Sequence, residues 1–197
     1  GLGLHRELRE HFGHLKTGRG VVYPMEAQMQ LLIDAAVCGA SRVFGLEMLA
    51  ADALFTHLCG GSVPSIDTVY DDLRRFDAEA LESLEHMVSR HGLAAVRRGQ
   101  FAEVHLDIDT TVTALFGEQQ GPNSGSNPHF HARPSYHPIL ARVAELGTVV
   151  AARLRPGDTS LGVDDIEDVQ VAIRRVRKAV GPKTIITVRI DAGGECT

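Results

Sequence analysis

Two short stretches of the chain place aspartates where metal chemistry could take place. His105 to Thr111 reads His-Leu-Asp-Ile-Asp-Thr-Thr inside an apolar run, and Arg189 to Gly194 reads Arg-Ile-Asp-Ala-Gly-Gly after a second one. An ionised Asp within an apolar strand is costly to bury unless a cation compensates it. Asp107 and Asp109 share one strand face, and Asp191 stands at a strand terminus. If the two strands are neighbours, Asp109 and Asp191 can approach to metal-bridging distance, and their hard oxygen ligands suit Mg²⁺ or Mn²⁺.

The same residue types can have other roles. Each Asp can serve instead as an N-cap or turn residue, and Asp191 before Ala-Gly-Gly fits a turn well. His129 and His131, with His137 nearby, form no closed four-ligand set, so zinc is not favoured. A Walker loop, a Gly-x-Ser-x-Gly and a Cys/His nucleophile pattern are all absent from the sequence, which leaves nucleotide hydrolysis and acyl transfer unsupported.

The composition is that of a globular chain of 197 residues, enough for one domain or for a small helical domain and an incomplete second one. Hydrophobic residues make up 44% and charged residues 23%, and no apolar run is long enough to span a membrane. Gly1 to Glu10 lacks the pattern of a secretory signal, so a cytoplasmic protein without membrane partners is expected. Of the three cysteines, Cys38, Cys59 and Cys196, all are expected to be reduced and the first two buried.

The first hundred residues predict helices, because apolar side chains recur at three-to-four spacing. The pattern indicates helices over 25–38 and 46–57. Ser65 is expected to cap a helix that continues through Phe76, and Asp77 to cap the next one. Residues 1–99 are therefore expected to be a helical region.

From residue 100 onward the period changes. One long strand is expected over 101–116, a hairpin of strands over 139–146 and 148–154, an amphipathic helix over 161–180, and a buried strand over 184–190. The order is strand, strand, strand, helix, strand. The whole chain is thus predicted to be α+β, with an α/β domain over 100–197.

This order is that of the ribonuclease H-like fold, and local motifs sharpen the likeness to DDE transposases of bacterial insertion sequences (transposase DDE domain group 1). Four segments resemble motifs of that family in the right order. They are Leu106–Val112 (Leu-Asp-x-Asp-x-Thr), Arg133–Leu140 (Gly-Tyr-His-Pro-Leu), Leu154–Thr159 (Leu-Arg-x-Gly-Asn, with Asp158 in place of Asn) and Val188–Gly193 (Val-Arg-x-Asp-Ser-Gly). Cys38–Arg42 and Pro64–Val69 resemble the family's helical region.

The resemblance implies a DNA transposase in which three carboxylates hold two divalent metals, Mg²⁺ or Mn²⁺, for in-line attack on a phosphodiester. It makes Asp109 the first ligand and Asp191 the second, with Asp107 in reserve for the first. The third, a Glu on a later helix, is expected beyond Thr197, since Glu195 lies too close to Asp191. The ribonuclease H-like domain is therefore expected to be incomplete here.

DNA is the expected partner, namely the terminal inverted repeats of the element, and a homodimer is possible. Charge supports this locally: residues 131–190 carry ten basic and six acidic residues, a net +4, while the remainder is −9. Arg155, Arg174, Arg175, Arg177 and Lys178 are the candidate DNA contacts; those on the helix have the alternative role of a solvated helix end that complements the dipole. The alternatives to a transposase are an inactive remnant that only binds DNA or dimerises, and a separate ribonuclease H-like nuclease.

Overall fold

The computed structural model describes residues 3–115, 123–124, 134–159 and 165–190. The chain forms two compact units, Gly1–Ser83 and Leu84–Thr197, so the division falls inside a helix rather than at residue 99, where the sequence pattern changes. The reason is that the second half of that helix, α6 (Ala78–Arg98), packs Leu93 and Val96 into the core of the second unit. Neither unit has, among its described residues, a helix long and apolar enough to cross a membrane.

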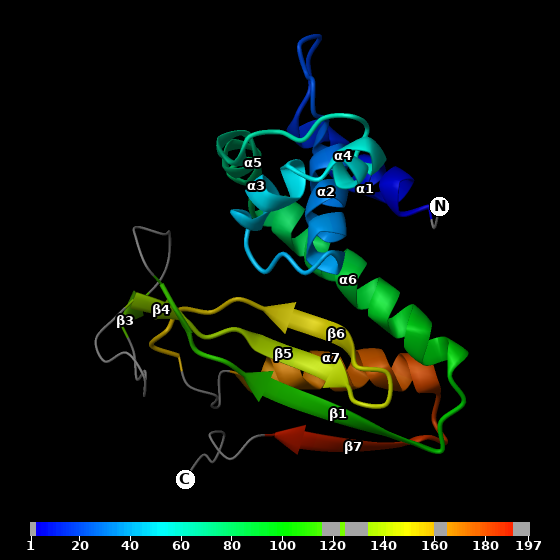
Figure 1. Cartoon of the computed structure of the whole chain (residues 1–197). Coiled ribbons are helices and arrows are strands. Elements are labelled where there is room, and N and C mark those ends of the chain that lie inside the picture. The colour runs from blue at the N-terminus through cyan, green and yellow to red at the C-terminus, as the bar shows by residue number, and fades with distance from the viewer. Residues whose placement is uncertain (1–2, 116–122, 125–133, 160–164, 191–197) are drawn as a thin grey trace. The chain divides into compact units, whose positions relative to one another are not determined.

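The first unit is helical, as predicted (Figure 1). Its core is formed by buried side chains of four helices: Leu31, Ala35, Leu46, Phe55 and Val69. The elements in order are α1 (Leu4–Phe12), the 3-10 turn η1 (Gly13–Leu15), α2 (Met25–Val37), α3 (Gly45–Ala50), α4 (Ala53–Leu58), α5 (Ile66–Leu73) and the start of α6.

Both predicted N-caps of this region are present. The Ser65 hydroxyl accepts a hydrogen bond from the Thr68 amide at 3.3 Å, and the Asp77 carboxylate accepts one from Ala80 at 2.9 Å. The single helix expected over 46–57 is wrong, because Asp52 caps a new helix there by accepting hydrogen bonds from two backbone amides.

The expectation that Cys38 and Cys59 are buried is also wrong. Cys38 is exposed and Cys59 is only half-buried. Each follows the last turn of a helix, at the C-cap of α2 and of α4 respectively, where the periodic apolar face no longer predicts burial. Partial burial raises the pKa of the Cys59 thiol, and the nearby Asp34 carboxylate raises it further.

One buried carboxylate links the helices of the first unit. Asp72 of α5 is 3% exposed and accepts hydrogen bonds from Lys16 at 2.6 Å, from Arg75 at 3.1 Å and from Gln28. Burial alone would raise the pKa of Asp72, but the bonds from Lys16 and Gln28 outweigh it and lower the pKa below its usual value. This cluster therefore ties α5 to α2 and to the chain before it.

The second unit contains a four-stranded sheet in the order β6-β5-β1-β7 (Figure 1). Its strands are β1 (Glu103–Thr110), β5 (Ile139–Val143), β6 (Thr148–Arg153) and β7 (Ile185–Ile190). β1, β5 and β6 pair in antiparallel fashion, while β7 lies parallel to β1 after the crossover helix α7 (Ile166–Val180). The predicted hairpin, the described part of the predicted helix and the α+β class are thus confirmed, and the first and last strands are neighbours. The expectation that the last strand is buried is wrong, because β7 lies at the edge of the described sheet and its residues are exposed or half-buried.

The long strand expected over 101–116 is divided in two. β1 ends at Thr110, and after Thr111 and Val112 the chain enters a second, small sheet with order β2-β4-β3. In that sheet β2 (Thr113–Ala114) and β3 (Asn123–Ser124) both pair with β4 (Pro134–Tyr136). The alternation of apolar and polar residues continues from β1 into β2, although the two strands pair in different sheets. Alternation alone does not indicate such a change of sheet.

The core of the second unit lies on one face of the larger sheet. Val104, Leu106 and Ile108 of β1 are buried there with Ala172 and Val176 of α7, which passes behind the sheet in Figure 1. α6 passes close to the backbone of β6 at a glycine. A Cβ on Gly92 would lie 2.0 Å from the backbone oxygen of Val149, so only glycine fits at this crossing.

Candidate functional site

The predicted site residues of β1 lie on the face of the sheet opposite to this core. Residues of β1 alternate in burial, so His105, Asp107 and Asp109 project away from the α7 side. The predicted sharing of one strand face by Asp107 and Asp109 follows from this alternation. The two aspartates have different surroundings.

Asp107 is engaged by arginines from both neighbouring strands. Arg189 of β7 donates from Nε to Asp107 Oδ1 at 2.5 Å, and Arg142 of β5 donates from Nη2 to Oδ2 at 3.5 Å. Both arginines are the direct register partners of Asp107. The bond from Arg189 is the main reason that the pKa of the Asp107 carboxyl lies below its usual value. Both oxygens of this carboxylate therefore already have cationic partners.

Asp109 has no such partner. It is exposed, it lies opposite Leu140 of β5, and its carboxylate has no hydrogen bond or ion pair to any other residue that the structure describes. A free, solvent-facing carboxylate is available to a cation, whereas a carboxylate already paired with two guanidinium groups is not. Geometry therefore favours Asp109 over Asp107 as a metal ligand.

The parallel pairing of β1 with β7 is described up to the residue that precedes the second predicted ligand in the sequence. The last described pair is Ile108 with Ile190. In the sequence, Asp109 directly follows the first of these residues and Asp191 directly follows the second. Asp191 itself lies outside the described residues, as do Glu195, Cys196, His129 and His131.

The face of the sheet opposite to the core, which carries His105, Asp107 and Asp109, is called the open face below. Further from the end of β1, this face carries hydrogen-bonded polar pairs. His105 donates from Nδ1 to Glu145 at 2.7 Å, and the backbone amide of His105 also donates to that carboxylate, at 3.0 Å. Burial would raise the pKa of Glu145, but the hydrogen bonds from His105 bring it below its usual value. Thr187 of β7 donates to Glu103 of β1 at 2.6 Å. The open face thus carries a row of bonded polar side chains along β1, which leads to Asp109.

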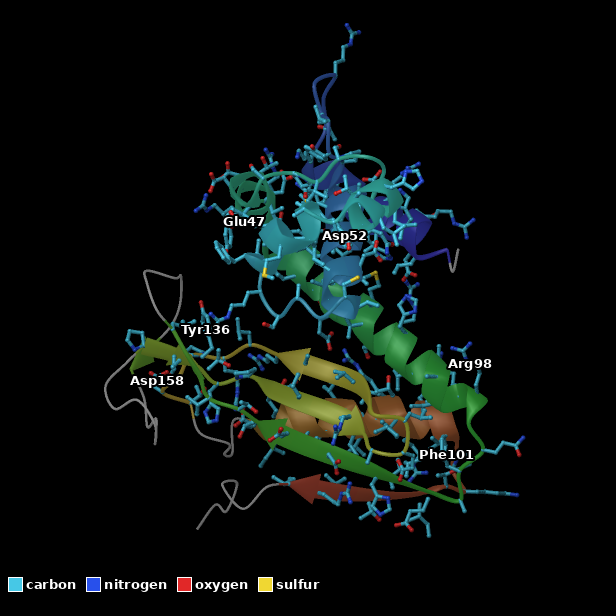
Figure 2. The ribbon with its side chains drawn as sticks, in the orientation of Figure 1. Glu47, Asp52, Arg98, Phe101, Tyr136 and Asp158 are labelled. Carbon is cyan, nitrogen blue, oxygen red and sulfur yellow. The ribbon has the colours of Figure 1, made fainter. Side chains whose placement is uncertain are left out.

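Two of the family-like motifs pack against each other near the small sheet, where Figure 2 labels Tyr136 and Asp158. His137 and Arg155 exchange hydrogen bonds: the His137 amide donates to the Arg155 carbonyl at 2.8 Å, and Arg155 Nε donates back at 3.0 Å. The ring of His137 also donates from Nδ1 to the carbonyl of Thr159. The Tyr-His-Pro and Leu-Arg-Pro-Gly segments therefore hold one another in place.

Arg155 is buried, with 5% of its surface exposed, and pairs with the equally buried Asp165 before α7. Its Nη2 atom has no hydrogen-bond partner in the described part of the chain. Sequence reasoning missed this buried pair and placed Arg155 at a DNA surface. The signal for this pair in the sequence was that the Leu154–Thr159 motif, which contains Arg155, shortly precedes the start of α7.

The other predicted DNA contacts divide by location. Arg175 forms a two-bond ion pair with Glu85 of α6, at 2.5 and 3.1 Å. Arg177 donates to the carbonyls of Gly181 and Thr184, as a basic residue at a helix end should. Arg174 and Lys178 are exposed on α7. Only these last two of the five project into solvent from the described structure.

The described residues contain no group of three His, Cys, Asp or Glu side chains placed to hold a metal. The carboxylate of Asp109 nevertheless fits the hard oxygen donor that Mg²⁺ or Mn²⁺ requires, because it is exposed and has no partner within the described ranges. The candidate site therefore rests on Asp109 and on its position at the end of the β1–β7 pair.

Comparison of the sequence with protein families agrees with the observed fold and with the position of Asp109 near the end of β1. The model of the transposase DDE domain group 1 matches residues 1–197, and the chain belongs to this family. Its α+β architecture, with a helical region followed by a ribonuclease H-like strand order, is the one that the motifs predicted.

No curated protein matches the sequence. Among solved structures, the chain is similar to "Mos1 transposase paired-end complex with left transposon end", with 9% identity and a TM-score of 0.30. This similarity covers 87% of the chain and 53% of the Mos1 transposase chain, so the protein spans about half the length of that neighbour.

Proposed function

We propose that this protein supplies the first two metal-binding carboxylates, Asp109 and Asp191, of a DNA transposase that cuts and joins the ends of an insertion sequence. The observation that carries the proposal is the parallel pairing of β1 with β7 up to Ile108 and Ile190. Family membership supports the reaction class, and the register supports the two residues.

The choice between the two aspartates of β1 follows from charge. Asp107 is held between Arg189 and Arg142, so bringing a metal to it would require breaking ion pairs. Asp109 is exposed, and neither of its carboxylate oxygens has a partner among the described residues. We therefore assign Asp109 as the ligand and give Asp107 no direct contact with metal.

When bound, Mg²⁺ or Mn²⁺ supplies Lewis-acid stabilisation of charge at the reacting phosphate. The chain's own part is to hold Asp109 on the central strand, whose inner face is fixed by Leu106 and Ile108 in the core. A ligand on a rigid, centrally paired strand keeps its position better than one on a loop. The fold thus preorganises the site before DNA arrives.

DNA is the proposed partner, specifically the terminal inverted repeats of the element. Arg174 and Lys178, one turn apart on the exposed side of α7, are the residues we propose to meet phosphate groups. Helical residues 1–99 are proposed to bind DNA or to mediate a homodimer, as in the family interpretation of the sequence.

Binding of Mn²⁺ to the whole chain, followed by electron paramagnetic resonance, tests the site. Asp109→Asn should weaken Mn²⁺ binding by more than about ten-fold. Asp67→Asn, which removes an exposed carboxylate of α5, is the matched control and should bind as the wild type does. Equal affinity in both variants would refute the assignment. Salt-dependent binding to terminal inverted repeats by a chain that binds no Mn²⁺ would instead favour a DNA-binding or dimerising module.

A further inference from the structure

An ion-pair cluster spans three strands on the open face of the sheet. Asp107 of β1 lies between Arg189 of β7 and Arg142 of β5, and its side chain is 21% exposed. In the described sheet, β7 pairs with β1 alone, so β7 is an edge strand held from one side. A side-chain contact to β1 matters more for such a strand than for one with two neighbours.

The cluster lies next to the proposed metal site along β1. Asp107 and Asp109 are two residues apart on the same face, a separation of roughly 6.6 Å along a strand. Arg189 likewise precedes Asp191 by two residues in the sequence. Asp107 and Arg189 are register partners, so their bond marks the alignment of β1 with β7 immediately ahead of the carboxylates.

A slip of one residue would invert every side chain of β7 relative to the sheet. Arg189 would then turn toward the core, where Val188 and Ile186 now pack, and Asp107 would lose its 2.5 Å partner. Both consequences are unfavourable, because a guanidinium would be buried and a carboxylate left with only the 3.5 Å contact to Arg142. The pair therefore opposes the slip from both strands.

We propose that Asp107 and Arg189 are positioning residues, whose ion pair holds the end of β7 against β1 in the register that the metal site needs. This inference rests on the proposed function. It assigns a role to the family-like Asp of Leu-Asp-x-Asp and to the Arg of Val-Arg-x-Asp that is separate from metal ligation. Arg142 is secondary, since its contact is longer and comes from the already well-paired strand β5.

The test compares Asp107→Asn and Arg189→Gln with Thr187→Val in the whole chain. Thr187→Val removes another side-chain bond between β1 and β7, two residues further along β7 from Asp109 than Arg189 is, and is therefore the matched control. Mn²⁺ affinity by electron paramagnetic resonance is expected to fall about ten-fold in the first two variants. It should stay within about three-fold of wild type in the control, because an exposed polar pair contributes little.

A second readout does not depend on metal. Amide hydrogen exchange in β7 should accelerate more in Asp107→Asn and Arg189→Gln than in Thr187→Val, and Arg189→Lys should restore part of the protection. Equal acceleration in Asp107→Asn and Thr187→Val would overturn the inference. So would faster exchange with unchanged Mn²⁺ affinity, because the pair would then be merely structural.

The design separates failure of the inference from failure of the proposed function. If the wild-type chain binds no Mn²⁺, or if Asp109→Asn binds it unchanged, the proposed function fails. The exchange comparison between Asp107→Asn and Thr187→Val then decides by itself whether the pair fixes the end of β7. If β7 amides lose protection from exchange in Asp107→Asn but not in Thr187→Val, the ion pair fixes the end of β7. If both variants lose the same protection, this role is refuted.

Discussion

Replacing Gly92 by alanine should destabilise the second unit, although alanine is the better helix former. Gly92 lies in the middle of α6, where glycine costs about 1 kcal/mol relative to alanine. A Cβ there would lie 2.0 Å from the backbone oxygen of Val149 and 3.1 Å from its carbonyl carbon. The first contact is about 1 Å shorter than real Cβ atoms make, and a strand backbone cannot rotate away as a side chain can.

The magnitude follows from these opposing effects. Overpacking of a rigid contact costs up to about 3 kcal/mol. Subtracting the gain in helix propensity leaves a net loss of about 2 kcal/mol in the free energy of unfolding. For a unit of this size that corresponds to a fall of roughly 8 °C in the melting midpoint.

Urea denaturation and thermal unfolding, both followed by circular dichroism, measure this loss. Gly20→Ala is the control, because a Cβ at Gly20 would meet no atom within 4 Å. We expect the control to be neutral or slightly stabilising. If Gly92→Ala is as stable as wild type or more so, the close crossing of α6 over β6 is not present in the protein.

Further predictions concern charged residues. Glu85→Gln removes the two-bond ion pair with Arg175 and should lower the free energy of unfolding by about 1–2 kcal/mol in urea titrations; no change would mean that the pair is not formed. Asp72→Asn should cost about 3 kcal/mol at pH 7, since it leaves the charge of Lys16 without its buried partner. The folded pKa of Asp72 is lowered, so its contribution is complete above the unfolded value of about 3.9 and is lost as the pH falls through the folded value. Urea titrations at pH 7, 5 and 3.5 should therefore show a constant difference between wild type and variant at the first two and a smaller one at the third; a difference independent of pH would refute the cluster. Asp109→Asn should unfold within about 0.5 kcal/mol of wild type, because an exposed, unpaired carboxylate stabilises nothing.

Much of the fold could be predicted from local pattern. Ser65 and Asp77 cap helices because each precedes an apolar stripe and can accept from a free amide. The α7 helix follows from clear helical periodicity, and the β7 strand from a short, nearly continuous apolar run. Asp52 shows what periodicity cannot predict. Apolar residues recur at helical spacing on both sides of it, so it looks like a surface residue of one helix, yet its carboxylate caps the start of a new helix.

The site could be predicted only in part. Alternation in β1 places Asp107 and Asp109 on one face, but the sequence does not tell which of them is paired. That depends on register, which brings Arg189 and Arg142 opposite Asp107. Burial of Arg155 was equally hidden, since an arginine in a basic segment looks solvent-exposed until its tertiary partner is known.

The central claim is that Asp109, not Asp107, binds the metal at the end of β1. Substituting Fe²⁺ for Mg²⁺ and generating hydroxyl radicals with ascorbate and peroxide cleaves the polypeptide next to the bound ion. We expect cuts close to Asp109 and Asp191 that disappear in Asp109→Asn and persist, more weakly, in Asp107→Asn. Cuts that survive Asp109→Asn unchanged, or that cluster elsewhere in the chain, would contradict it.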